Sequence, residues 1–175
     1  MPWRAWSDSG FTFRADRGRK YAAGMILAAV GDTGYNIMLL LHILSAMVAF
    51  APAFTHPILK GQSRDLDASA RSKVLGFIAQ NGRRVYGPAL ILTGLFGFGV
   101  QGMSESAWGF DQGWLLTAAI IWVLMNGVLH GMIFPAEKAL AAGDDSAEKK
   151  LDAGGATITV MLIVMLWLMT FKPGL

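Results

Sequence analysis

The stretch YNIMLLLHILSAMVAFAPAF, residues 35–54, contains no Asp, Glu, Lys or Arg in 20 consecutive positions. A helix of about 20 apolar residues is long enough to cross the roughly 30 Å of hydrocarbon in a bilayer. Three further uncharged apolar stretches follow, at residues 85–103, 113–134 and 156–171. The sequence therefore predicts an all-α membrane protein built as a bundle of four transmembrane helices.

The composition supports this class of protein and excludes some kinds of binding site. Hydrophobic residues make up 54% of the chain and charged residues only 15%, which is too apolar for an ordinary soluble domain. The chain has no cysteine, which excludes disulfides, iron–sulfur clusters and thiolate metal sites. We expect one membrane domain over residues 35–175, in which any redox chemistry would need a bound cofactor.

Residues 1–34 form an amino-terminal tail whose fate the sequence leaves open. A basic segment precedes the apolar run 21–30, which is too short to span a bilayer. An interfacial helix is the favoured interpretation, because a short apolar run is flanked by cations. The same pattern outlines a signal peptide, and a translation start at Met25 would remove most of the basic tail.

The loops between the spans predict the orientation. The loop 104–112 has no Lys or Arg, whereas loops 55–84 and 135–155 have all of the following: Lys60, Arg64, Arg71, Lys73, Arg83, Arg84, Lys138, Lys149 and Lys150. By the positive-inside rule these two loops are cytoplasmic, and both termini lie outside a bacterial inner (plasma) membrane. Arg83 and Arg84 are expected at the headgroup level, orienting the second span. The expected partner is the lipid bilayer rather than nucleic acid, since the basic residues lie between spans.

Small residues predict where helices approach one another closely. Gly87 and Gly94 fall on the second span, and Gly127 and Gly131 are four apart on the third. The latter pair is either a seam for a homo-oligomer or larger membrane complex, or packing within the same bundle, which is the favoured interpretation. The segment Asp65–Gln80 is expected to be a helical extension that continues into the second span.

Three histidines are the clearest candidates for binding a cofactor. His42 lies inside the first span, and His56 and His130 lie near the predicted cytoplasmic interface. An imidazole in hydrocarbon is costly unless it is paired or liganded. His56 and His130 match in depth, so they could ligate a metal or haem iron, or simply bond to backbone and water. For His42, a hydrogen bond to Thr93 or Asn126 is an alternative to ligation.

A row of methionines and one amide side chain are further candidates for specific contacts inside the spans. Met161, Met165 and Met169 recur every four residues and so share a helix face. Thioethers bind Cu(I), but a stripe at helical spacing is also the pattern of a packed face, which we favour. Asn126 and His130 are four apart and are expected to form one polar patch inside the bundle.

Parts of the chain resemble a known family. Residues 35–44 with His42, the block 83–94 and the block 114–135 resemble small bacterial predicted integral membrane proteins grouped as a domain of unknown function. The opening helix is more distantly similar to the membrane domain of copper-resistance protein D and to the small bacterial membrane-bound protoporphyrinogen oxidase. That second resemblance implies haem b as a cofactor, with His42 as its ligand.

Three functions remain open from the sequence. The first is an inner-membrane bundle without its own catalytic centre, acting as a structural, accessory or small-molecule-binding protein. The second is a haem-binding redox protein that uses His42, or His56 with His130. The third is copper handling through His42 and the methionine ladder.

Overall fold

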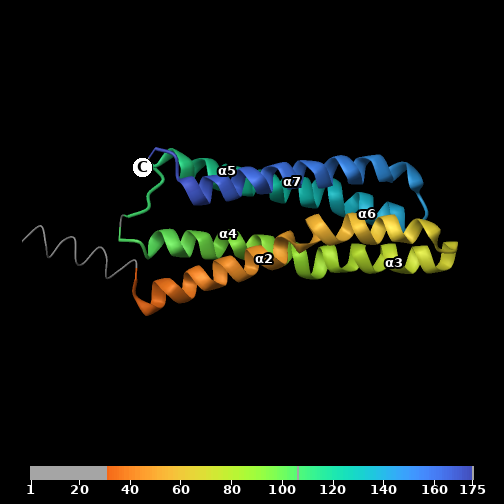
Figure 1. The fold of residues 1–175 in the computed structure, drawn as a ribbon, viewed down its shortest axis with the longest axis horizontal. Helices are drawn as coiled ribbons and strands as arrows, with labels where there is room; N and C mark the ends of the chain where they lie inside the picture. Colours follow the sequence, from red (N-terminus) through yellow and green to blue (C-terminus); the bar gives the residue numbers. More distant parts are fainter. Residues whose placement is uncertain (1–30, 106, 175) are drawn as a thin grey trace, which may run out of the picture.

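A computed structural model describes residues 31–105 and 107–174, and every regular element in these ranges is helical. Four helical stretches are long and apolar enough to cross a membrane, beginning near residues 33, 68, 113 and 145. The chain is thus a multi-pass membrane protein with the predicted four-helix architecture (Figure 1). The predicted interfacial helix of residues 21–30 and the alternative start at Met25 lie outside the described ranges.

The first span is α2, Thr33–Gln62, which is longer than the stretch 35–54 because it continues past Pro52 and Pro57. Asp32 caps it, since its carboxylate accepts a hydrogen bond of 2.7 Å from the Tyr35 amide. A 3₁₀ turn, η1 at Ser63–Asp65, ends the helix and begins the turn to the next one.

The second and third spans are each built from an α-helix, a π-helical turn and another α-helix. The second runs through α3, Ala68–Asn81, then η2, Gly82–Tyr86, into α4, Gly87–Gly102. A helical extension was predicted at Asp65–Gln80, and the structure confirms it from Ala68 onward, since Asp65 belongs to η1. The third runs through α5, Gly113–Val128, then η3, Leu129–Ile133, into α6, Phe134–Ala141.

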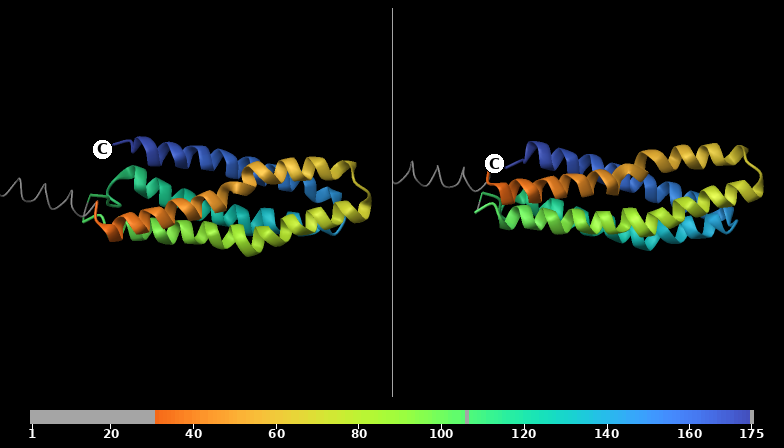
Figure 2. Two further views of the ribbon diagram at one scale, coloured as in Figure 1. Left: turned by 60° about the horizontal axis from the view of Figure 1, so that its bottom comes forward. Right: turned by 90° about the horizontal axis from the view of Figure 1, so that it is seen from below.

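The last span is α7, which continues to the end of the predicted stretch 156–171. It covers Glu148–Phe171, and the short 3₁₀ turn η4, Asp145–Ala147, leads into it. The start of α2, the 103–112 loop and the carboxyl end lie together at one end of the bundle (Figures 1 and 2). The α2–α3 and α6–α7 turns lie at the other end.

Three clusters of buried side chains run along the bundle. They are Leu75, Ile78 and Leu140; Leu90, Met125 and Leu162; and Trp114, Ala118 and Leu168. Many other large apolar side chains are exposed, with Met47 at 67% and Phe171 at 68% of their full surface. Because lipid tails solvate apolar side chains, such exposure is expected for spans in a bilayer.

Candidate functional site

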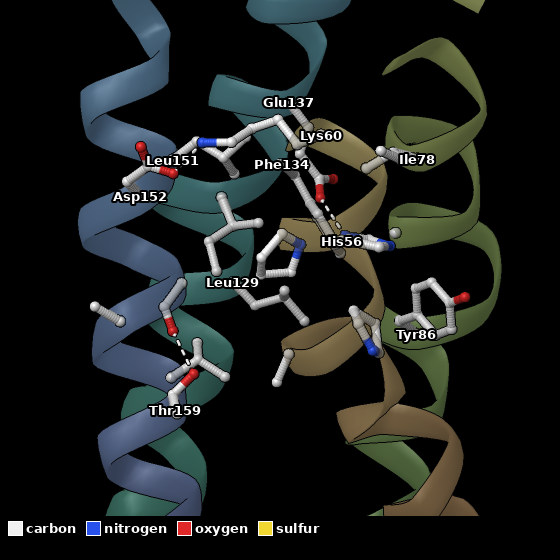
Figure 3. Close-up of a pocket in the computed structure, with 18 of the residues that line it drawn as sticks. His56, Lys60, Ile78, Tyr86, Leu129, Phe134, Glu137, Leu151, Asp152 and Thr159 are labelled. Carbon is white, nitrogen blue, oxygen red and sulfur yellow. Dashed lines mark hydrogen bonds and ion pairs between the residues drawn. The ribbon is translucent and has the colours of Figure 1, made fainter. Parts of the chain in front are cut away.

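A pocket of about 300 Å³ lies between the helices at the end that carries the α2–α3 and α6–α7 turns (Figure 3). Side chains from α2, α3, η2, η3, α6 and α7 line it. Most are apolar, including Phe50, Leu75, Ile78, Leu129, Ile133, Phe134, Leu140, Leu151 and Ile158. The volume is at the lower end of the range for small-molecule sites, and an apolar wall with a few polar groups is typical of them.

The central polar feature of the pocket is a histidine paired with a buried carboxylate. Nδ1 of His56 on α2 lies 3.2 Å from Oε1 of Glu137 on α6. Glu137 is only 3% exposed, and its Oε2 is buried without a hydrogen-bond partner. A carboxylate oxygen accepts, so Nδ1 donates, and a neutral imidazole with its hydrogen at Nδ1 carries its lone pair at Nε2. Within the described residues Nε2 has no hydrogen-bond partner.

Two glycines let the helices close around this pair. A Cβ at Gly82 would lie 2.6 Å from Oε2 of Glu137 and 3.2 Å from the Phe134 ring. A Cβ at Gly87 would lie 2.9 Å from the same ring. The packing role predicted for Gly87 is therefore confirmed, and Gly82 has a similar role that the sequence analysis did not assign.

Both π-helical turns lie at the level of the pocket, and both precede a proline. The Gly87 amide bonds to the Gly82 carbonyl, and the Phe134 amide bonds to the Leu129 carbonyl, five residues back in each case. Pro88 and Pro135 follow directly and cannot donate to the ladder. The wide turn inserts one residue and changes which side chains face the pocket, and such turns are frequent at functional sites.

Ion pairs surround the outer rim of the pocket. The Lys60 ammonium lies 3.3 Å from the Glu148 carboxylate and also pairs with Asp152. Arg64 pairs with Glu148, and Arg71 lies 3.0 Å from Asp145. These pairs connect α2, η1 and α3 to η4 and α7 at this end of the bundle.

The three histidines are placed in different surroundings. Nδ1 of His42 donates to the Thr93 carbonyl at 2.7 Å, which is one of the bonds predicted for it, made to the backbone. His42 and His56 are 14 residues apart on one helix, so they differ by about 21 Å in height. His130 is exposed, with its ring packed edge-on against Phe134 at 4.9 Å. The structure does not place His130 among the residues that line the pocket with His56.

The polar patch predicted from Asn126 and His130 is split. Nδ2 of Asn126 donates to the Trp122 carbonyl, and its Oδ1 is buried without a partner, whereas His130 faces outward. The single-patch interpretation is wrong because His130 lies in η3, where the wider turn changes the spacing from Asn126. Thr93 is buried and bonds within its own helix to the Ala89 carbonyl.

The remaining glycines divide into two groups. A Cβ at Gly94 would clash with the Trp122 ring, so another helix approaches closely at this glycine as predicted, and the structure shows that it is α5. Gly127 and Gly131 are exposed, and a Cβ at either would meet nothing within 4 Å. Packing within the bundle, the favoured interpretation of this pair, is therefore wrong, because both lie on the outer surface of the third span.

The methionine ladder packs into the core. Met161 and Met165 contact the cluster of Leu90, Met125 and Leu162, and Met169 packs with Met165 against the next cluster. Among the described residues, no group of three or more His, Asp or Glu is positioned to hold a metal ion. Arg83 and Arg84 are exposed in η2, at the same level as the pocket.

No family model, curated protein or solved structure matches this chain. The assignment of the candidate site therefore rests on its geometry. Sequence reasoning found His56 and missed Glu137, because residues 135–155 were assigned to a loop. The third span was predicted to end at residue 134, directly before Pro135, whereas α6 continues the helix for about two turns.

Proposed function

We propose that this protein is a membrane bundle that binds a small apolar molecule in the pocket between α2, α3, α6 and α7. The observation that carries the proposal is the His56–Glu137 pair, buried in a wall of otherwise apolar side chains. A buried carboxylate with an unpartnered oxygen costs free energy in a fold that serves packing alone. Such a group is common where a site must hold a polar atom of a ligand in a fixed position.

The walls set the class of ligand. Apolar side chains supply most of the lining, so the ligand gains affinity by leaving water or lipid headgroups for an apolar cavity. The charged side chains near the rim, Lys60 and Asp152, already pair with each other. A predominantly apolar molecule therefore suits the pocket better than a highly charged one.

A pair of glycine variants tests this proposal. Gly155 lines the pocket and Gly127 lies on the outer surface, and a Cβ at either would meet nothing within 4 Å. Gly155→Leu should fill the pocket, whereas Gly127→Leu makes the same chemical change outside it. We expect purified wild-type protein and Gly127→Leu to bind 4-hexylanisole in calorimetric titrations and Gly155→Leu to lose most of this affinity. Equal binding by all three proteins would reject the pocket as the site.

A second candidate function is haem binding through His56. Histidines that ligate metals usually donate their other ring N–H to a carboxylate, and His56 donates Nδ1–H to Glu137. His56 would hold the iron through Nε2, and the iron would supply electron transfer. The pocket contributes one histidine rather than two, since neither His42 nor His130 lines it. An absorption spectrum of the purified protein with a Soret band that is lost in His56→Gln would favour this candidate.

We propose that the end of the bundle with the α2–α3 and α6–α7 turns faces the cytoplasm of a bacterial inner membrane, as expected for segments 55–84 and 135–155, and that both termini lie outside. The charge difference between these segments and the loop 104–112 supports this orientation. The exposure of Arg83 and Arg84 is compatible with the headgroup contacts expected of them. Reporter fusions after residues 62, 105 and 145 should map the orientation, and replacing both arginines with Glu should disturb it. An unchanged map would remove the role assigned to these arginines.

A further inference from the structure

The polar atoms of the pocket differ in how much hydrogen-bonding capacity they have left. The Lys60 ammonium is held by Asp152 and Glu148. Oε1 of Glu137 accepts from His56, and Oε2 is buried against Gly82, where a Cβ would lie 2.6 Å away. A ligand therefore meets few polar atoms that are both reachable and unused.

His56 supplies such an atom. Its side chain is 18% exposed, and its Nε2 has no hydrogen-bond partner within residues 31–105 and 107–174. Since Glu137 favours the hydrogen at Nδ1, Nε2 of the neutral imidazole can accept a hydrogen bond but cannot donate one. Tyr86 packs edge-on against the imidazole at 5.4 Å, and its hydroxyl points away from His56 (Figure 3).

The surroundings of His56 favour a neutral aromatic donor. Phe50, Tyr86 and Phe134 bring three aromatic rings to the lining, and aromatic rings pack well on one another. An ammonium group could also donate to Nε2, but burying a further charge in an apolar cavity costs more than burying a hydroxyl.

We propose that the ligand of this pocket is a neutral apolar molecule of the phenol class, whose hydroxyl donates a hydrogen bond to Nε2 of His56. This inference rests on the proposed function and specifies its ligand. Glu137 acts as a positioning residue, because it touches the imidazole and sets the tautomer that accepts the bond.

Two ligands that differ in one hydrogen-bond donor test the proposal. 4-Hexylphenol carries the hydroxyl, and 4-hexylanisole carries a methyl ether in its place. Wild-type protein should bind the phenol roughly tenfold more tightly, as expected for one buried hydrogen bond. His56→Phe should remove this preference and keep the affinity for the anisole, which also shows that the variant is folded. His130→Phe is the matched control, since it makes the same replacement on the outer surface and should keep the preference.

The outcomes separate the two proposals. Equal affinity of the wild-type protein for both ligands would overturn the hydroxyl assignment and leave the pocket as a site for apolar molecules. A preference that survives in His56→Phe would also overturn it. If neither the phenol nor the anisole binds, the proposed function itself is rejected. An aliphatic amine of equal length that binds more tightly than the phenol would show that the site selects cations.

Discussion

The two ends of this bundle are built in opposite ways. At the end that carries the 103–112 loop, Trp108 donates to the Tyr35 hydroxyl at 3.2 Å and packs edge-on against Trp114 at 5.7 Å. The Lys172 ammonium lies 4.0 Å from the centre of the Trp108 ring. We call these four residues the aromatic end. At the charged end, formed by His56, Lys60, Glu137, Glu148 and Asp152, the helices leave a pocket and hold it with ion pairs.

The difference indicates that stability and the proposed binding depend on different residues. Aromatic rings at the aromatic end fill the space between helices, as in the interfacial belts of membrane proteins. At the charged end, buried polar groups line a cavity. This arrangement is typical of functional sites rather than of packing. Substitutions at the aromatic end should therefore reduce stability without changing binding, and substitutions at the charged end should change binding first.

The largest effect is expected at the aromatic end. Trp114 is 5% exposed, and Trp114→Ala should lower the free energy of unfolding in detergent by about 3 kcal/mol through loss of packing. Trp167 is 49% exposed, so Trp167→Ala should change it much less. Chemical denaturation of both variants measures the difference. Equal losses would mean that the aromatic end is not a packed core.

The next effect concerns the close approach at the charged end. Gly82→Leu would force Glu137 and Phe134 aside, and overpacking of this kind costs about 2 kcal/mol. Gly76 lies in α3 of the same span, and a Cβ there would meet nothing within 4 Å. Gly76→Leu should be neutral or stabilising, since Leu is the better helix former. Similar denaturation curves for the two variants would contradict the close packing at Gly82.

A smaller effect is expected on the tautomer of His56. In the wild-type protein Nδ1 should carry the hydrogen, because the Glu137 carboxylate accepts from it. In Glu137→Ala this acceptor is removed, so the tautomer with the hydrogen at Nε2 should become populated. Glu137→Gln retains a carbonyl oxygen and should keep the wild-type tautomer. ¹⁵N NMR of labelled histidine distinguishes the forms, with His42 as an internal control bound to the Thr93 carbonyl. An Nε2–H signal for His56 in the wild type would refute the assignment.

The smallest effect concerns the cation over the tryptophan ring. Lys172→Gln should lower the free energy of unfolding by about 0.5 kcal/mol, the usual size of an exposed cation–π contact. Lys138→Gln, at an exposed lysine on α6, serves as the control. The loss at Lys172 should shrink in concentrated salt. A salt-independent loss would indicate a steric cause.

Much of the fold could be predicted from the sequence, because the hydrocarbon thickness fixes the length of an apolar helix. The beginning of α5 at Gly113 and the end of α7 at Phe171 coincide with the predicted limits. The close approach at Gly94 was also predictable, since a small residue in a span commonly faces another helix.

The site could be predicted only in part. A histidine at the end of a span is a visible signal, so His56 was found. Glu137 was missed because Pro135 resembles a helix end, and a π-helical turn before a proline has no distinctive composition. The outward position of His130 and Gly131 was also unpredictable, since both lie in this π-helical turn, where the inserted residue changes which way side chains face.

The location of a bound ligand tests the central claim most directly. A diazirine derivative of 4-hexylanisole can be cross-linked by light to the protein in nanodiscs, and the labelled peptides identified by mass spectrometry. The account predicts labels within residues 49–60 of α2 and 151–159 of α7, which line the pocket. Labels confined to the shallow outer surface at Phe98, Ile120 and Leu124 would contradict it.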